Sequence, residues 1–459
     1  MNILILNGSP AGEDSITLYT MLYIQRHFPE HRYQVLHVGQ RIRAMEKERN
    51  AWREALEKAG LIVFCYPVYT FLAPAQLHRF IELVKESGID LSGKYATQIT
   101  TSKHFYDVTA HQYIRDNCGD LGLRYVRGLS ADMEDLTREE GRKDALDFFR
   151  YVMWNMERGY FEPVPVRVPV RCGEHTEPAA EKLSIPAPKR VVIVADFSNT
   201  KDGRLREMCE RLINRLPCET EIADIGEFPF AGGCLGCFRC AADGQCVYKD
   251  GFADYLRDSI QSADGLVYAY TVRDHGMGYR FKLFDDRQFC NGHRTVTMGK
   301  PVGYLVDGCL DAEPNLTMLM EARSEVGGNT LAGIACNQRD PDRAVDQLAE
   351  TLCYAITQNW QPPKNFYGVG GLKIFRDLIW RMQGLMRADH KFYKAHGFYD
   401  FPQKKRGAMM AMYLAGAMMN SPKLRKKMGG KITEGMLAPY KKALEKDPGP
   451  SEKEPSDGK

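Results

Sequence analysis

The hydrophobic pattern begins with a short apolar run, a polar loop and then a helical period. Residues 2–6 are apolar over a stretch too short for a helix, which is typical of a buried parallel strand. A polar loop follows, and from about Ser15 the segment SITLYTMLYIQRHF has helical spacing. Residues 61–65 form another apolar run, which ends in a Tyr-Pro-Val-Tyr loop and a helical stretch up to Val84. The pattern predicts an α/β fold built on a parallel sheet.

The same pattern returns after residue 190. Residues 191–195 repeat the first strand, and residues 196–204 repeat its polar loop, this time with basic residues. A helical period follows from Leu205 to Leu216, and residues 266–270 stand where 61–65 stood. We interpret this recurrence as an internal duplication.

The connecting segments suggest five parts. The Pro-rich stretch after Pro163 has no helical period and is typical of an extended linker, and the last residues are disordered by composition. We predict a first α/β domain at 1–160, a linker at 161–188 and a second α/β domain with the cysteine-rich loop at 189–360. A basic helical extension at 361–446 and a disordered tail at 447–459 follow.

Composition describes a globular protein with an uneven charge distribution. Of the 459 residues, 44% are hydrophobic and 26% charged, and no apolar run approaches the 18 residues of a membrane span. The net charge is +3, yet residues 361–459 hold 20 Lys and Arg against 9 Asp and Glu. The rest of the chain is therefore acidic, which argues against nucleic acid as its main partner. The opening MNILILNGSP lacks the basic start of a secretory signal, so we expect a cytoplasmic location.

The basic extension contains an unusual apolar stretch. Residues 407–419 are largely Ala, Met, Gly and Leu, and basic clusters flank them on both sides. This stretch is too short to span a bilayer. Residues 404–427 can lie on an anionic membrane surface, bind an acidic protein, or pack on the body of the molecule.

Four of the thirteen cysteines are crowded into CLGCFRCAADGQC. Thiolates at this spacing suit an iron–sulfur cluster. A structural zinc ion is a second interpretation, although such a site usually has two separated Cys-x2-Cys pairs. Redox-active or structural thiols are the third. We expect the other cysteines, Cys290 among them, to be core thiols. The candidate metal ligands are Cys234, Cys237, Cys240 and Cys246.

Hydroxyl side chains follow the first strand of each repeat. With free N–H groups at a helix start, such side chains form a phosphate cradle. A plain strand-to-helix turn is the alternative for each loop. The candidate phosphate-binding residues are Ser9, Ser15 and Thr17 in the first repeat, and Ser198 and Thr200 in the second.

These loops resemble those of the NADPH-dependent FMN reductase branch of the flavodoxin-like superfamily. The Gly-Ser-Pro and Pro-Val-Tyr loops carry the resemblance, and the cysteine run with the later FKLFDDR segment is similar to the iron–sulfur flavoproteins of that group. The resemblance implies two tandem flavodoxin-like doubly wound parallel sheets and a homo-oligomer. It also implies FMN as cofactor, a [4Fe–4S] cluster on the four cysteines and NAD(P)H as electron donor. The residues it implies around the flavin ring are Pro67, Val68, Tyr69, Thr70 and Thr101.

The sequence departs from that family at two loops. Glu13 and Asp14 replace a basic residue of the first phosphate loop, and Thr271-Val-Arg273 replaces Pro-Val-Tyr in the second repeat. His275, in the altered loop, can contact a flavin or substrate or be a solvated loop histidine.

Two functions follow from these observations. The first is an FMN-dependent NAD(P)H oxidoreductase that passes electrons to a [4Fe–4S] cluster or a small acceptor. The alternative is a non-enzymatic flavodoxin-like redox sensor or scaffold, whose cysteines bind metal or sense oxidation.

Overall fold

The computed structural model describes residues 1–163, 173, 181–184, 189–198, 203–338, 340–419, 434 and 437–446. The chain divides into two compact units, 1–396 and 397–459. The predicted linker 161–188 falls largely outside the described residues, and the predicted tail 447–459 falls wholly outside them.

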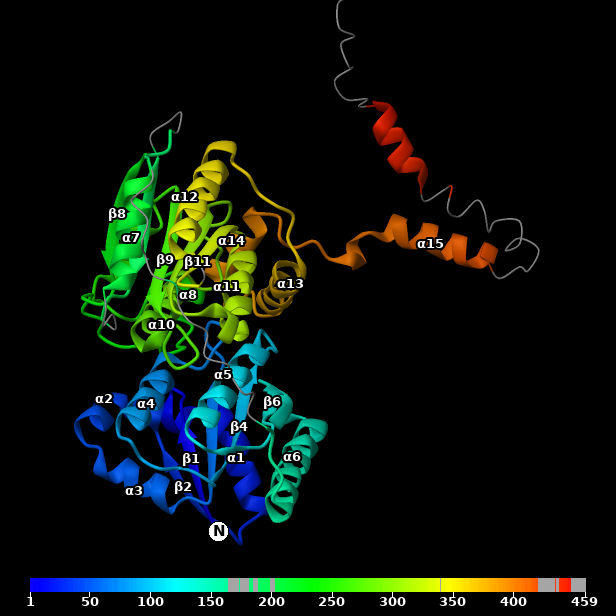
Figure 1. The fold of residues 1–459 in the computed structure, drawn as a ribbon. Helices are drawn as coiled ribbons and strands as arrows, with labels where there is room; N and C mark the ends of the chain where they lie inside the picture. Colours follow the sequence, from blue (N-terminus) through cyan, green and yellow to red (C-terminus); the bar gives the residue numbers. More distant parts are fainter. Residues whose placement is uncertain are drawn as a thin grey trace, which may run out of the picture. The chain divides into compact units, whose positions relative to one another are not determined.

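The first unit contains two parallel sheets with flavodoxin-like topology, as predicted (Figure 1). The first sheet has the order β2-β1-β3-β4-β5, with β6 paired to β4. Its register is parallel throughout. The strands are β1 (Asn2–Asn7), β2 (Arg32–Leu36), β3 (Leu61–Pro67), β4 (Tyr95–Ser102), β5 (Arg124–Tyr125) and β6 (Leu129–Asp132).

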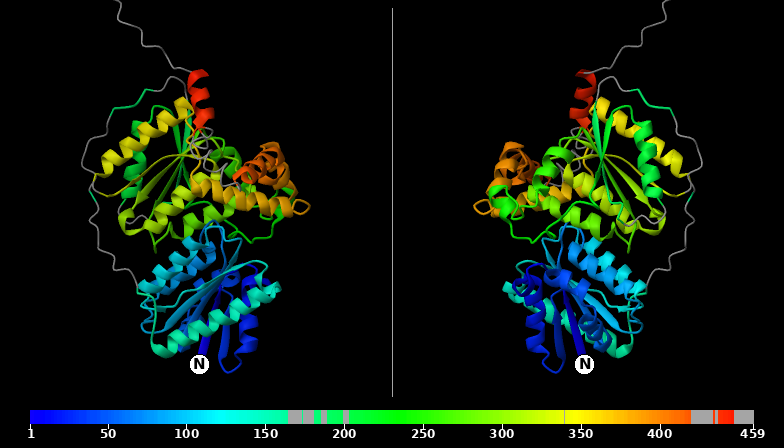
Figure 2. Two further views of the ribbon diagram at one scale, coloured as in Figure 1. Left: turned by 90° about the vertical axis from the view of Figure 1, so that its right-hand side faces the viewer. Right: turned by 90° about the vertical axis from the view of Figure 1, so that its left-hand side faces the viewer.

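Helices cover both faces of this sheet (Figure 2). Helices α1 and α6 bury Met21 and Phe149 against one face, and α4 and α5 bury Phe80 and Ile114 on the other side. The helices are α1 (Ile16–His27), α2 (Val38–Lys47), α3 (Asn50–Lys58), α4 (Ala75–Glu86), α5 (Asp107–Asp120) and α6 (Glu139–Arg158).

The second sheet has the order β11-β10-β9-β7-β8 and is also parallel. Helices α7 and α12 pack on one face around Leu212 and Leu348. The strands are β7 (Arg190–Ala195), β8 (Glu219–Asp224), β9 (Gly265–Thr271), β10 (Pro301–Asp307) and β11 (Thr330–Cys336). The helices are α7 (Arg204–Arg215), α8 (Arg239–Asp243), α9 (Phe252–Tyr255), α10 (Gly278–Arg287), α11 (Pro314–Gly327) and α12 (Pro341–Gln358).

The two sheets share one hydrophobic core. Residues of α4 and α5, such as Leu77 and Ile114, belong to the same buried cluster as Phe284 of α10 and Leu319 of α11. Helix α4 packs on α10, and α5 packs on α11. A continuous apolar core of this kind holds the two sheets as one body.

The C-terminal extension is divided between the two units. Helices α13 (Phe366–Arg381) and α14 (Arg387–Ala395) belong to the first unit, where Ile379 and Tyr393 are fully buried. The second unit begins at Gly397 and contains α15 (Arg406–Met419). Among the described helices, none has both the length and the apolar character needed to cross a membrane.

Candidate functional site

One cavity of about 450 Å³ lies where the first sheet's strand ends meet the cysteine-rich loop of the second domain. Ligands of parallel α/β sheets bind outside the carboxyl ends of the strands, so its position is the expected one for the first domain. All eight flavin-site residues predicted in the first domain line it: Ser9, Ser15, Thr17, Pro67, Val68, Tyr69, Thr70 and Thr101.

The loop after β1 is shaped by its own side chains. Asn7 donates from Nδ2 to the Gly12 carbonyl at 2.7 Å and accepts the Ser9 N–H at 3.2 Å. Ser15 is the N-cap of α1, where its hydroxyl accepts the Leu18 N–H at 3.3 Å, as the helical period beginning there predicts. This arrangement gathers hydroxyls at a helix N-terminus, where an anion is favoured. Of the two acidic residues in this loop, Asp14 lines the cavity and Glu13 does not.

The loop after β3 forms a tight two-residue turn. Tyr69 and Leu72 exchange backbone hydrogen bonds of 2.8 and 3.0 Å, and Thr70 and Phe71 have φ values of 39° and 71°. Two consecutive positive φ angles are costly for residues other than glycine, so the turn needs support from its surroundings.

Helix α10 of the second domain supplies that support. Lys282 donates from Nζ to the Tyr69 carbonyl at 3.0 Å and to the Thr70 hydroxyl at 2.7 Å. Asp286 accepts from the Thr70 hydroxyl at 2.6 Å and also pairs with Lys282. The side chains of Lys282 and Asp286 are both fully buried. The second domain therefore fixes the conformation of the first domain's loop.

The same helix anchors the cysteine-rich loop. Arg287 donates from Nη1 to the Gly232 carbonyl and from Nη2 to Asp250, each at 2.8 Å. Burial opposes ionisation of Asp250, but its hydrogen bonds with Arg287 outweigh this effect and lower its pKa to about 2. The FKLFDDR segment thus holds both the turn of the first domain and the cysteine loop of its own domain.

The cysteine-rich loop lies directly against the turn after β3. A Cβ atom placed on Gly236, whose φ is +64°, would lie 2.0 Å from Tyr69 Oη. Burial raises the pKa of Tyr69 well above its ordinary value, and the neighbouring Cys234, Asp286 and Cys237 add to the effect. Two loops far apart in the sequence therefore form one wall of the cavity.

The four predicted metal ligands share the cavity with a fifth cysteine. Cys234, Cys237, Cys240, Cys246 and Cys290 all line it. Burial, followed by the nearby Cys246 and Cys240, raises the pKa of Cys290 to about 12. The prediction that Cys290 is a core thiol is confirmed, because it belongs to the buried hydrophobic core. Its position at the cavity was not predicted, because a single cysteine after a helix carries no spacing signal.

The cysteine positions do not fit an iron–sulfur cluster as they stand. Among the described residues, which include all five thiols, no group of three or more Cys, His, Asp or Glu side chains is placed to hold a metal ion. We therefore derive no chemical step through a cluster.

The described residues of the second domain's predicted phosphate loop do not line this cavity. Ser198 donates from its N–H and its hydroxyl to Asp196 at 3.0 and 2.5 Å, and it does not line the cavity. Thr200 lies outside the described residues. A buried carboxylate thus stands beside the predicted phosphate loop, where it would repel a phosphate.

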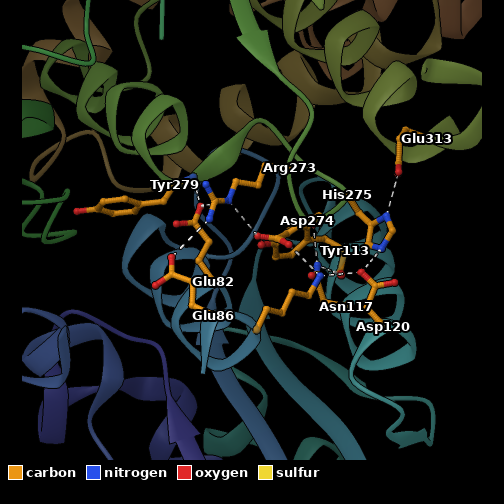
Figure 3. Close-up of polar contacts among 11 residues, drawn as sticks. Glu82, Glu86, Tyr113, Asn117, Asp120, Arg273, Asp274, His275, Tyr279 and Glu313 are labelled. Atoms are coloured by element: carbon orange, nitrogen blue, oxygen red, sulfur yellow. Dashed lines mark hydrogen bonds and ion pairs between the residues drawn. The ribbon is translucent and has the colours of Figure 1, made fainter. Parts of the chain in front are cut away.

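The altered loop after β9 forms a network of ion pairs between the two domains (Figure 3). Asp274 and His275 have φ values of 51° and 64°, so the backbone repeats the turn of Thr70 and Phe71. The side chains instead reach helices of the first domain. The contacts are Arg273 with Glu86 at 3.4 Å, Asp274 with Lys85 at 3.0 Å, and His275 with Asp120 at 2.8 Å.

His275 also pairs with Glu313, at 3.0 Å. Burial disfavours the charged imidazole, but hydrogen bonds to Asp120 and Glu313 outweigh it and raise the pKa of His275 to about 9. The side chain is 11% exposed and does not line the cavity. His275 therefore pairs the two domains. The sequence analysis had offered two other interpretations, a flavin or substrate contact and a solvated loop histidine.

Residues 1–148 match the sequence profile of a protein family described as a flavodoxin-like fold. An iron–sulfur flavoprotein of Archaeoglobus fulgidus is 26% identical over 174 residues, which are 36% of this chain and 79% of that protein. Neither match extends over both sheets, so the internal duplication stays a prediction.

Solved structures with similar folds include reductases. A putative quinone reductase from Klebsiella pneumoniae is 17% identical, covers 36% of this chain and 88% of its own, and has a TM-score of 0.28. An FMN-dependent NADH-azoreductase from Bacillus anthracis, in complex with FMN, is 16% identical. It covers 34% of this chain and 98% of its own, with a TM-score of 0.26. At these values the likeness concerns the fold of part of the chain and says nothing of its activity.

Proposed function

We propose that this protein is an FMN-dependent oxidoreductase that takes electrons from NAD(P)H and passes them to a small acceptor. The observation that carries the proposal is the meeting of three loops, after β1, β3 and β4, in one cavity of about 450 Å³. That size is within the ordinary range for cofactor pockets. The Archaeoglobus fulgidus relative, an iron–sulfur flavoprotein, supports the same conclusion.

The residues of the first domain suit FMN. Ser9, Ser15 and Thr17 would hold the phosphate at the N-terminus of α1, and residues 67–70 with Thr101 would contact the ring. Thr17 and Thr101 are joined by a hydrogen bond of 2.5 Å between their hydroxyls, so the phosphate loop and the third loop are held together. Bound FMN would supply acceptance of a hydride and its release as one or two electrons.

We infer one FMN per chain, held by the first domain. Asp196 beside the second phosphate loop and the ion pairs of the second turn support this stoichiometry. The chain's own residues then orient the ring and exclude water, because the cysteine loop closes one side of the cavity.

The first experiment is an absorption spectrum of protein purified without oxygen, with released flavin, iron and sulfide assayed on the same sample. We expect about one flavin per chain, bleached by NADH or NADPH. Colourless protein without flavin would overturn the proposal and favour the redox sensor or scaffold. About four iron and four sulfide per chain would show that the cysteines rearrange around a [4Fe–4S] cluster.

Two matched variants locate the flavin. S9A removes a hydroxyl from the cavity, and the loss of a hydrogen bond to a charged phosphate corresponds to roughly tenfold weaker FMN binding or more. S198A removes the equivalent hydroxyl from the second domain and should leave FMN affinity unchanged. Equal effects of the two variants would contradict a single site in the first domain.

Contacts outside the cavity stay predictions. Met410, Met412 and Tyr413 of α15 are 62%, 68% and 72% exposed, which supports a membrane-surface or acidic-protein contact through residues 404–427. The cytoplasmic location and the homo-oligomer are likewise proposed.

A further inference from the structure

The cavity continues from the loops of the first domain into the second domain. Its lining there comes from strands β9 and β10 and from helices α10 and α11, which carry none of the predicted flavin-site residues. We call this part of the cavity the inner chamber. Its polar and aromatic lining residues are Tyr268, Tyr270, Phe281, Asp285, Tyr304 and Arg323.

Three tyrosines of the inner chamber lie on one face of the second sheet. Tyr268 and Tyr270 are two residues apart on β9, and Tyr304 of β10 is the register partner of Tyr268. The ring centroids of Tyr268 and Tyr304 are 5.6 Å apart, and that of Tyr270 lies 4.7 Å from Phe281 of α10. Three hydroxyls thus enter a layer between sheet and helices, where a polar group needs a hydrogen-bond partner.

Two of these hydroxyls have no such partner within the described part of the chain. Tyr270 is 1% exposed, and its Oη is buried without a hydrogen bond. Tyr268 Oη likewise bonds to no described residue. The Tyr304 hydroxyl donates to the Met320 carbonyl at 3.4 Å, and burial raises the pKa of Tyr304 to about 12. Buried polar groups without partners are rare in native proteins, so the tyrosines indicate that a ligand completes the chamber.

Arg323 of α11 places a guanidinium in the same chamber. Its Nη2 donates to Asp285 Oδ1, and its Cζ lies 5.5 Å from the centre of the Phe71 ring. The side chain is nevertheless 27% exposed, and because Arg323 lines the cavity, this exposed surface faces the chamber. Its Nε and Nη1 donate to no residue of the described chain, so charged donors remain for a ligand.

Asp285 orients the guanidinium and limits the charge that the chamber can accept. Its side chain is 5% exposed, and its Oδ1 also accepts from Gln288 Nε2 at 3.3 Å. Since the Arg323–Asp285 pair is neutral, a dianion such as a phosphate ester would leave two uncompensated negative charges in a buried space. A single carboxylate adds one charge and forms charge-assisted hydrogen bonds that a neutral carbonyl group cannot form.

We propose that the inner chamber binds a small monocarboxylic acid with an apolar body. The carboxylate accepts from Arg323 and from the Tyr268 hydroxyl. The apolar body contacts Phe281, Val302 and Leu319, which line the same part of the cavity. The inference goes beyond the proposed function, because every polar group that it uses belongs to the second domain.

Isothermal titration calorimetry of the full-length protein with two probes of equal size tests the ligand class. Benzoate and benzamide share a ring and differ in charge. We expect benzoate to bind with a dissociation constant of about 1 mM or lower, in keeping with the affinity that so small a ligand reaches. Benzamide should bind at least about tenfold more weakly, because it forms no charge-assisted hydrogen bonds. Equal affinities would refute the assignment of a carboxylate, and no binding of benzoate would refute the site.

A matched pair of tyrosine variants locates the probe. Y268F removes one hydroxyl and leaves no charge unpaired, so we expect roughly fivefold weaker benzoate binding. Y354F is the control, because Tyr354 of α12 is 57% exposed and does not line the cavity. Its benzoate affinity should equal that of wild type. Equal benzoate affinities for Y268F and Y354F would exclude the inner chamber as the binding site.

A double variant tests the guanidinium without leaving a buried charge alone. R323M/D285L removes both members of the ion pair, so folding should be preserved, and urea denaturation checks this. Benzoate binding should fall below detection. A folded R323M/D285L protein that binds benzoate as wild type does would contradict the role of Arg323.

The variant S9A separates the inner chamber from the phosphate loop of the first domain. Weaker benzoate binding in S9A, with Y268F unaffected, would show that the carboxylate binds at the start of α1 and would overturn the inference. Colourless protein whose benzoate binding is weakened by Y268F would overturn the proposed function alone. Stoichiometric flavin in a protein that does not bind benzoate would overturn this inference alone.

Discussion

Replacement of Gly236 by alanine tests whether the cysteine loop shapes the proposed flavin site. The added Cβ would lie 2.0 Å from Tyr69 Oη and 3.0 Å from Cζ, against an ordinary contact distance of 3.4 Å or more. The Tyr69 ring must then move by about 1.4 Å. The ring packs on Phe289, whose centroid lies 6.0 Å away, so it has little room to rotate. The turn after β3 should therefore shift with it, against the hydrogen bond that Lys282 donates to the Tyr69 carbonyl at 3.0 Å.

Gly88 provides a control for backbone strain. Its φ is +63°, against +64° for Gly236, and a Cβ atom there meets nothing within 4 Å. Each alanine should cost about 1 kcal/mol of folding free energy through the left-handed conformation. The difference between G236A and G88A therefore isolates the collision with Tyr69.

We expect FMN binding to separate the two variants. G88A should bind FMN as wild type does. G236A should bind at least roughly tenfold more weakly, which corresponds to about 1.4 kcal/mol. The assay is quenching of flavin fluorescence during titration of flavin-free protein, together with urea denaturation for folding stability.

Removal of the phenol oxygen gives an internal check. In Y69F the atom nearest to the new Cβ is Cζ at 3.0 Å, so the G236A/Y69F double variant should recover part of the lost affinity. Y69F alone should have little effect. Equal FMN affinities for G236A and G88A would refute the reasoning, because the cysteine loop would then not determine the position of the turn.

Three further predictions concern other parts of the chain. K282M leaves Asp286 buried without its partner and should lower the free energy of unfolding by about 3–5 kcal/mol in urea denaturation, and K282M/D286L should recover part of it. The raised pKa of His275, about 9 against an ordinary 6.5, stabilises the fold fully below pH 6.5, and the stability should fall as the pH rises to 9. H275Q should lack this decline, so parallel denaturation curves against pH would contradict it. Removal of residues 397–459 should abolish sedimentation with phosphatidylserine vesicles and leave the flavin spectrum unchanged; continued sedimentation would exclude α15 as the contact.

Local sequence pattern was enough for the strands, the helix starts and the loops of the first domain. The apolar run 2–6 lies within β1, and Ser15 caps α1, because hydrophobic period and capping depend on neighbouring residues. The eight residues of the first domain that were predicted to hold a flavin line one cavity, because parallel strands bring their carboxyl ends to the same edge.

Contacts between residues far apart in the sequence could not be predicted from local sequence pattern. The sequence indicated a cysteine loop in the second domain and a flavin turn in the first, but not that Gly236 lies on Tyr69. Ser198 and Thr200 were assigned a phosphate by analogy with the first domain, and this stays a prediction. The sequence did not indicate that the Ser198 hydroxyl donates to Asp196. Residues 361–396 were predicted as part of an extension, yet Phe375 and Asp389 of this segment stand at the cavity or behind it.

The amino-acid sequence alone thus predicted two α/β domains on parallel sheets, their strand-end loops and a cysteine-rich loop. Each strand, helix start and loop is encoded within about 15 consecutive residues by periodicity, turn residues or spacing. The tertiary structure decided which loops line the cavity, which residues pair with the turn after β9, and that Phe375 of the C-terminal segment reaches the cavity. These outcomes depend on which side chains the shared core brings within about 4 Å of one another, and that distance carries no signal in a one-dimensional pattern.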